Sequence, residues 1–372
     1  MSTNKPARDP IQNLSNLFSD HAKGLLDAKG TDLVRQIGLE VVRGVVLDVL
    51  TGRNLRDSTE MLTRRRIASL NLATLAMFMK GATVSGDFVE NLPSLASEIL
   101  ERKRVSKNER WLAQWVLGLT DKAFQNVLRD SPEAIADYRE RYVSACRDVI
   151  ANAQREYGLL QGEVRLGSEA QAQINWAFVT YLLGTAGAQT LAIRGSEKSA
   201  YGKLFEKLVL GSLLHMLGFK RVSPDNPESL TRVFWLSSRE AKRESDATVL
   251  YRAGKGARFD IGFIGRGNPE ISLDKVSRFE REISLGRSKW YLATIILVDR
   301  IGANSRIEKM AKAIDGTIIQ MSMGYWPQQV AQQLNAKLGL KHELAAMQQS
   351  RIADYLREQL ATVPIQDFIP NT

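Results

Sequence analysis

The sequence predicts an α+β protein with a mostly helical N-terminal subdomain over residues 1–195, a mixed β-sheet core flanked by helices over 196–330, and a helical C-terminal tail over 331–372. Three observations predict this order. Apolar residues recur with a helical period through the first half, short alternating runs follow it, and Trp290–Val298 is a near-continuous apolar run, typical of a buried strand. A chain of 372 residues is long enough for two domains.

The composition narrows the classes of partner. Lys and Arg outnumber Asp and Glu by 51 to 41, a net charge of +10, which favours a polyanion such as nucleic acid over a membrane. Cys146 is the single cysteine, so the chain has no internal disulfide and we expect a cytoplasmic protein. Three scattered histidines offer no zinc-ligand spacing. The apolar stretch Ile174–Ile193 contains Asn, Gln and Thr, so we expect a buried helix there and not a membrane span.

The first half reads as a series of helices. Asp32–Leu50 carries an apolar stripe with a period of 3.6 residues, and Ser58–Gly81 is expected to form a second helix. The S-x-x-E pattern of Ser106–Glu109 and the S-x-x-Q pattern of Ser168–Gln171 are typical of capping boxes at helix starts.

Two basic clusters in this half are candidates for DNA contact. One surrounds the helix start at Ser106 and includes Arg102, Arg104 and Lys107, where side-chain charge and free backbone N–H groups could both meet phosphate. The other is the run of arginines at 64–66. The alternative for each is a solvated helix face. Trp111 and Trp115, one helical turn apart, are expected to anchor the core.

The pattern changes after Gly195. An apolar helix is expected over Ser199–Gly218, with Gly218 as its C-terminal cap. The chain then alternates between short strands and turns. Strands are expected at Phe219–Val222, Thr231–Leu236, Ala247–Arg252, around Asp260, at Trp290–Val298 and at Gly316–Met323.

Glu206 is the unusual residue of the predicted helix. At 100° per residue it shares a face with apolar residues, and a carboxylate on such a face is costly unless it is paired or lies near a cation. The apolar residues on this face are Val209, Leu210, Leu213 and Leu217. The alternative is a surface carboxylate paired with Lys203 or Lys207.

The stretch Arg258–Ile283 carries the remaining candidate acids. Asp260 lies on an apolar strand, a GRGNP turn follows, and Glu280 and Glu282 share one face of a second alternating segment. If the two strands pair, these carboxylates face Asp260, and such a group would suit a hard divalent cation. The alternative is a half-exposed hairpin with its charges in solvent.

These acids and their order resemble the PD-(D/E)XK nuclease superfamily, in which a helix Glu, a strand Asp and a following acid-x-Lys surround Mg²⁺. The segments SAYGKLFEKLVLGSLLHMLGF and FDIGFIGRGNPEISLDKVSRFE more closely resemble the CfrBI type of type II restriction endonuclease. The resemblance implies that Glu206 is the helix acid and that Asp260 is the central metal ligand. It spans residues 196 to 325 in its motifs.

The third motif departs from that pattern, because no acid-x-Lys follows Asp260 at a suitable distance. In one interpretation Glu280-Arg281-Glu282 replaces it, with Glu280 on the metal and Glu282 in the place of the lysine. In the other, Glu270 and Lys275 supply the acid and the lysine, which requires a β-bulge between them.

The resemblance implies a Mg²⁺-dependent endonuclease that cuts double-stranded DNA at a specific sequence, with CCWWGG as the suggested target. A palindromic target would be met by a homodimer. Two alternatives remain at this point: a repair or mobile-element nuclease with the same core, and a non-catalytic DNA-binding regulator built on the helical half.

Overall fold

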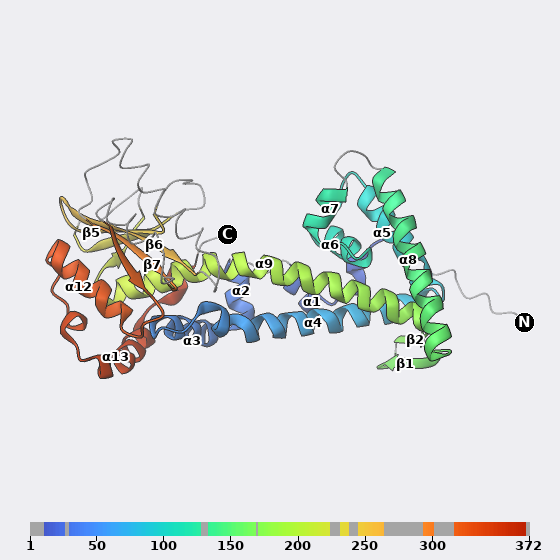
Figure 1. Ribbon diagram of the computed structural model, residues 1–372, viewed down its shortest axis with the longest axis horizontal. Coiled ribbons are helices and arrows are strands. Elements are labelled where there is room, and N and C mark those ends of the chain that lie inside the picture. The colour runs from blue at the N-terminus through green and yellow to red at the C-terminus, as the bar shows by residue number, and fades with distance from the viewer. Residues whose placement is uncertain are drawn as a thin grey trace, which may run out of the picture. The chain divides into compact units, whose positions relative to one another are not determined.

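The computed structural model describes residues 11–26, 30–127, 133–168, 170–223, 231–237, 245–263, 293–300 and 316–369. These residues form an α+β protein with a mixed sheet, as expected (Figure 1). The chain divides into two compact units. The first comprises Met1–Ala28 and Leu62–Glu197, and the second comprises Lys29–Met61 and Lys198–Thr372.

The first unit is helical apart from one hairpin. Its helices pack around a shared core in which Phe78, Leu92 and Trp115 are fully buried. The elements are the 3₁₀ helix η1 (Leu14–Leu17), α1 (Asp20–Leu26), most of α4 (Leu55–Val84), α5 (Phe88–Glu101), α6 (Lys107–Val116), α7 (Asp121–Val127), α8 (Glu133–Tyr157), the hairpin β1 (Gly162–Leu166) and β2 (Ala170–Ile174), and the first part of α9 (Trp176–Met216).

Helices α4 and α9 run antiparallel in this unit, because their contacts pair later α4 residues with earlier α9 residues. The Thr74 hydroxyl donates to Gln189 Oε1 at 2.6 Å, and Phe78 meets Phe178 edge to face with ring centroids 5.7 Å apart. Among the described helices, α4 alone is long and apolar enough to cross a bilayer. One third of its most apolar stretch, 33%, is buried inside the protein. The contacts with α9 identify α4 as a helix packed within the protein.

Two expectations for the helical half are wrong. Gln171 lies in a strand and Ser168 in the turn before it, so they form no capping box, and the side chain of Asn175 caps α9 instead by accepting from the Phe178 N–H at 2.8 Å. The helix expected over Asp32–Leu50 is interrupted at Gly38, whose φ of 94° is outside the helical range. It forms α2 (Gly30–Ile37) and α3 (Leu39–Leu50).

The capping box at Ser106 is half confirmed. The Ser106 side chain accepts from the Glu109 N–H, as expected for an N-cap. The Glu109 carboxylate, however, is buried and accepts from the backbone N–H groups of Leu14 and Ser15, at 2.5 and 2.8 Å. It therefore ties the start of η1 to α6.

The second unit is built on a six-stranded sheet in the order β3-β4-β5-β6-β7-β8. Strands β4, β5 and β6 are antiparallel neighbours, whereas β6, β7 and β8 run parallel and β3 is parallel to β4. The bounds are β3 (Lys220–Arg221), β4 (Val233–Leu236), β5 (Ala247–Arg252), β6 (Lys255–Gly262), β7 (Ala293–Val298) and β8 (Gly316–Gln320). All six lie within or beside the predicted strand positions.

The C-terminal elements belong to the core of this unit. Helix α12 (Trp326–Leu338) contacts the sheet, and α13 (Gln349–Thr362) contacts α3. The ring of Phe368, in the 3₁₀ helix η3 (Ile365–Phe368), packs 5.9 Å from that of Phe234 in β4. A Cβ on Gly211 of α9 would overlap the Phe368 ring. Residues 331–372 therefore pack as part of the second unit, and so does the segment around α3 that we had placed in the helical subdomain.

The helices expected over Ile174–Ile193 and Ser199–Gly218 belong to one element, because α9 continues through Gly195 as a single 41-residue helix. Its end is as predicted. Gly218 adopts a φ of 84°, and the Phe219 N–H bonds the Leu214 carbonyl, which is the arrangement of a glycine cap. The last turns of α9 thus carry Glu206 into the second unit.

Candidate active site

Asp260 lies in the centre of the sheet. Its strand, β6, has β5 on one side and β7 on the other, and Asp260 is only 1% exposed between the fully buried side chains of Phe259 and Ile261. The alternative of a charge exposed to solvent is therefore wrong for Asp260. Burying a carboxylate in this way is costly, so its position calls for cationic or hydrogen-bonding company.

A second carboxylate lies beside it, on the residue that precedes the neighbouring strand β5. In the antiparallel ladder of β5 and β6, Ala247 pairs with Phe259, so the next position places Asp246 opposite Asp260. Asp246 is half-buried, and its Oδ2 accepts a hydrogen bond of 2.9 Å from the backbone N–H of Ile261. The Asp246 carboxylate is thus held at the Asp260 position of β6.

The sequence analysis did not identify Asp246. The strand Ala247–Arg252 and the glycine-containing turn after it were both predicted, but counting outward from the pair Arg252–Lys255 would place Asp246 opposite Ile261. The register shifts by one residue between Leu250 and Arg252, and this shift brings Asp246 opposite Asp260. The pairing of the two acids therefore depends on an irregularity that the sequence pattern did not show.

The two carboxylates suit a hard divalent cation, which binds oxygen ligands. They form an incomplete ligand set, because among the described residues no three His, Cys, Asp or Glu side chains gather into a group able to hold a metal. Further ligands would come from other parts of the chain, from water or from substrate.

Glu206 has the surroundings that we predicted. It is half-buried on α9, and Val209, Leu210 and Leu213 on the same helix face are fully buried. Its carboxylate therefore lies at the margin of the core of the second unit.

The other four candidate residues, Glu270, Lys275, Glu280 and Glu282, lie outside the described residues. The expected pairing of the Asp260 strand with the segment of Glu280 and Glu282 falls outside the described residues as well. Within the described residues, β6 has β5 on one side and β7 on the other. The participation of these residues in the site stays a prediction.

The basic cluster at the start of α6 lies on the surface of the first unit. Arg102, Arg104 and Lys107 are all exposed. Arg102 Nη1 donates to the Gln12 carbonyl at 2.8 Å, and the Lys107 ammonium lies 4.5 Å from the centre of the Trp111 ring. Trp115 is buried as expected, whereas Trp111 is half-buried and stacks beside it.

The arginines at 64–66 do not act as one cluster. Arg66 is 8% exposed, and its guanidinium donates three hydrogen bonds to the carbonyls of Leu25 and Leu26 at the end of α1. These carbonyls have no partner within their own helix, so Arg66 caps α1. Only Arg64 and Arg65 are exposed for a partner outside the protein.

Comparison with known proteins identifies the family. The family model of the CfrBI restriction endonuclease matches residues 39–306, which include Glu206, Asp246 and Asp260. The type II restriction enzyme CfrBI of Citrobacter freundii is 37% identical over 355 residues, covering 95% of this chain and 98% of the relative. The chain belongs to the CfrBI restriction endonuclease family. No solved structure matches it.

This CfrBI-family chain is thus an enzyme of the type II restriction class, a site-specific deoxyribonuclease, and the resemblance found in the sequence is confirmed. Family membership decides against the two alternatives of a repair nuclease and a non-catalytic regulator. Restriction endonucleases generally use divalent metal ions. Membership of this family is therefore consistent with a metal site at Asp246 and Asp260.

Proposed function

We propose that this enzyme is a Mg²⁺-dependent endonuclease whose active site is built on Asp260 and Asp246. The observation that carries the proposal is their position opposite each other where β5 begins beside β6, with Asp260 only 1% exposed. A carboxylate buried at this depth in a DNA-cleaving enzyme is better explained by a cation than by packing.

Each residue of the proposed site has a separate role. Asp260 and Asp246 present oxygens to the cation, together with Glu280 or Glu270. Lys275 or Glu282 orients the attacking water, and Glu206 acts through a water at the edge of the site. Mg²⁺, when bound, supplies charge that stabilises the phosphorane-like transition state and lowers the pKa of a coordinated water.

The fold proposed for this core is that of the PD-(D/E)XK nucleases. It is supported by the order of the elements: a helix with an acid, the antiparallel strands β4, β5 and β6, and then the parallel strand β7. In this arrangement the central acids project from neighbouring strands of one hairpin, as Asp246 and Asp260 do.

A single incubation tests the reaction. Long duplex DNA treated with the protein and Mg²⁺ should give discrete fragments, and the same mixture with EDTA should give none. A duplex containing CCWWGG should be cut, and one with a single base of that site changed should survive. Cleavage without a divalent cation would contradict the metal, whereas fragments from a different site would contradict only the target sequence.

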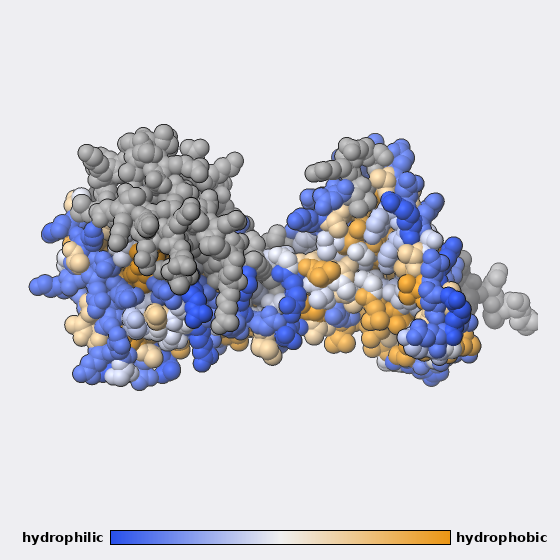
Figure 2. Space-filling model, viewed as in Figure 1, coloured by the Kyte–Doolittle hydropathy of each residue, from blue (hydrophilic) through white to orange (hydrophobic). Residues whose placement is uncertain are grey.

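We also infer that the enzyme is a cytoplasmic homodimer, because two-fold symmetric DNA is matched by two-fold symmetric protein. An exposed apolar face in the first unit supports this. Leu72 of α4 and Leu183 and Leu191 of α9 are 68%, 64% and 67% exposed, and Figure 2 shows hydrophobic residues at the surface along these helices. Residues 67–79 and 182–193 contain no charged side chain, so this apolar face suits a protein partner better than DNA.

The apolar face can be tested by its effect on the oligomeric state. Changing Leu183→Arg and Leu191→Arg should convert a dimer into a monomer, as measured by light scattering during size exclusion, because each arginine would be buried against its symmetry mate. Val149→Arg, on an exposed position of α8 in the same unit, is the matched control and should stay dimeric. A double variant that remains a dimer would place the interface elsewhere.

A further inference from the structure

A pocket of about 630 Å³ opens in the second unit. It is formed by the loop between α3 and α4, the residues that follow β7, and one residue that follows β8. The lining residues are Gly52, Arg53, Asn54, Arg56, Asp57, Asp299, Arg300 and Ser322. None of them belongs to the candidate active site described above.

The walls of this pocket are fixed by one amide side chain. Asn54 precedes α4 and caps it, since its Oδ1 accepts from the Arg56 N–H at 2.8 Å. Its Nδ2 donates to Asp299 Oδ2 at 2.6 Å. The start of α4 is therefore attached to the end of β7 through a carboxylate that is 9% exposed.

The loop itself is closely fitted. Gly52 has a φ of 94°, and a Cβ at this position would lie 2.9 Å from the backbone nitrogen of Gly324. A Cβ on Gly324 would in turn lie 3.1 Å from the Thr51 carbonyl oxygen. Two loops far apart in the sequence thus meet backbone to backbone, and a side chain at either glycine would push them apart.

Three arginines surround the opening. Arg53, Arg56 and Arg300 are all exposed, and Arg53 is positioned by Asp48, 3.2 Å away. Guanidinium groups have the planar fork that matches phosphate oxygens. Burial raises the pKa of the Asp299 carboxyl, while Asn54 and Arg300 oppose this. The lining contains three arginines and two acidic residues, Asp57 and Asp299.

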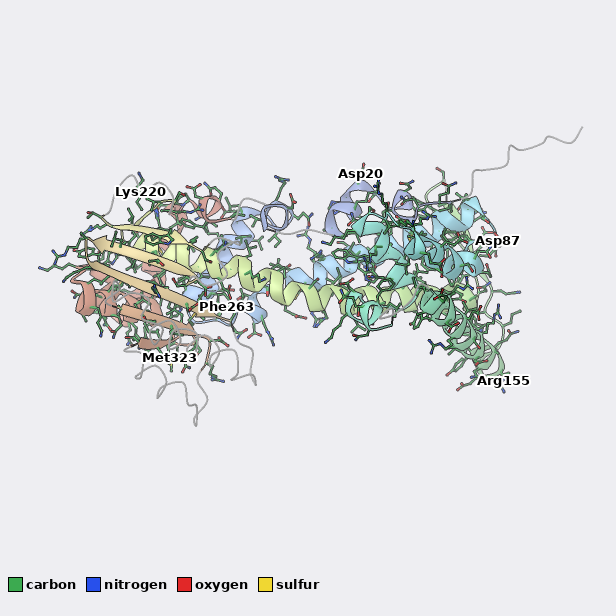
Figure 3. All side chains as sticks on the ribbon, turned by 90° about the horizontal axis from the view of Figure 1, so that it is seen from above. Asp20, Asp87, Arg155, Lys220, Phe263 and Met323 are labelled. Atoms are coloured by element: carbon green, nitrogen blue, oxygen red, sulfur yellow. The ribbon has the colours of Figure 1, made fainter. Side chains whose placement is uncertain are left out.

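The pocket lies beyond the carboxyl ends of β7 and β8, and Asp260 lies near the carboxyl end of β6. In the parallel pair of β6 and β7, Asp260 is level with Ile296, and Asp299 follows three residues later. From strand spacing and rise, the Cα atoms of Asp260 and Asp299 are roughly 11 Å apart. Figure 3 labels Phe263 and Met323, which follow β6 and β8 near these carboxyl ends.

Successive phosphates of one DNA strand rise by ~3.4 Å along the helix axis, and the strand also winds around that axis. A distance of this size therefore spans no more than a few nucleotides. A strand whose phosphodiester lies at Asp260 has neighbouring phosphates within this distance of the pocket. The three arginines are placed to meet phosphates of that strand.

We propose that Arg53, Arg56 and Arg300 bind backbone phosphates of the DNA strand a few nucleotides from the cleaved bond. The Asn54–Asp299 hydrogen bond is a positioning device, which holds the α4 start and the end of β7 at the correct separation. This proposal rests on the proposed active site at Asp260. It adds the surface that keeps the strand in register with that site.

The test measures equilibrium binding to duplex DNA over a range of salt concentrations without divalent cations, so that no cleavage occurs. Arg56→Ala combined with Arg300→Ala should weaken binding at least tenfold at low salt. It should also lower the slope of log affinity against log salt by about 0.9 for each phosphate that the protein no longer neutralises. Because phosphates carry no base sequence, the loss of affinity should be equal on a cleavable and an unrelated duplex.

Arg357→Ala is the matched control, since Arg357 is an exposed arginine of the same unit that pairs with Asp354 at 2.7 Å. It should leave the slope unchanged. Asp299→Asn keeps an oxygen acceptor for Asn54 but removes a negative charge, so it should tighten DNA binding severalfold. Thermal unfolding of each variant checks that the fold persists.

An unchanged slope in the double arginine variant, or weaker binding by Asp299→Asn, would overturn the phosphate site. A loss of affinity confined to the cleavable duplex would overturn it too, because it would mean that these side chains read bases. Failure of the proposed function looks different: the wild-type protein would not cut DNA with Mg²⁺, or its cleavage would persist after substitution of Asp260.

Discussion

The two compact units use their charged residues in opposite ways. In the first unit, charges that stand together in the sequence are separated by the fold, since Arg66 is buried as a cap for α1 while Arg65 beside it is exposed. In the second unit, charges that stand apart in the sequence are brought together, as Asp246 and Asp260 are by the ladder of β5 and β6. In this chain, neighbouring charges in the sequence therefore do not identify a shared binding site. The pairing of strands does identify charged residues that lie opposite each other.

The largest effect should come from the residues that complete the second unit's acidic site. If the E-x-E interpretation is correct, Glu280→Ala and Glu282→Ala each reduce the cleavage rate by several orders of magnitude, and Lys275→Ala is mild. If the displaced lysine is correct, Lys275→Ala and Glu270→Ala are inactive instead, and Glu282→Ala is tolerated. A water-orienting group acts only within about 3 Å of its target, so one set alone can reach the site. Single-turnover cleavage of the four variants decides.

Asp246 tests whether the pairing of β5 and β6 places a second functional carboxylate beside Asp260. Asp246→Asn keeps an oxygen that can accept from the Ile261 N–H but removes the charge, so cleavage should fall by about a hundredfold or more while DNA binding is retained. Asp354→Asn, an exposed carboxylate on α13 of the same unit, should cut normally. Normal cleavage by Asp246→Asn would show that the hairpin merely places this residue near the site.

In the first unit, the neighbours Arg65 and Arg66 test whether the fold gives different roles to charges that are adjacent in the sequence. Arg66→Ala leaves the Leu25 and Leu26 carbonyls without their donor, so the free energy of unfolding should fall by about 2–4 kcal/mol. Arg65→Ala should change it by less than about 0.5 kcal/mol. Urea unfolding of the two variants measures the difference, and equal stabilities would contradict the capping role of Arg66.

A smaller effect is expected from the basic cluster at the start of α6. Replacing Arg102, Arg104 and Lys107 with Ala should flatten the dependence of log affinity on log salt if these side chains meet phosphate. Because Arg102 and Lys107 already have partners in the first unit, we expect a weaker change than from Arg56 and Arg300. A slope equal to that of the wild type would assign the cluster to a solvated face.

Most elements of this fold were predicted from the sequence, and each wrong prediction has a physical cause. Most strands were predictable because they are short apolar runs near turn residues, although β3 consists only of Lys220 and Arg221. Gly218 marked the end of α9. The helices expected on either side of Gly195 form one helix, because a glycine within a helix costs only about 1 kcal/mol, which packing overrides. Gly38, by contrast, adopts a positive φ and divides a helix that the apolar stripe had made continuous.

The candidate site was predictable only where local pattern sufficed. Asp260 was visible as a lone carboxylate in an apolar strand, and Glu206 as a carboxylate on an apolar helix face. Asp246 required knowledge of which strands pair, and pairing is a tertiary property. The pocket at Asn54 combines segments 245 residues apart, which no local pattern reveals.

The most direct test of the central claim is to measure cleavage and binding in parallel for Asp260→Asn. The substitution retains the shape of the side chain but removes the charge that a cation requires. We predict that cleavage with Mg²⁺ is abolished while affinity for duplex DNA stays within severalfold of the wild type. Cleavage at a rate near that of the wild type would contradict the assignment of the active site to β6.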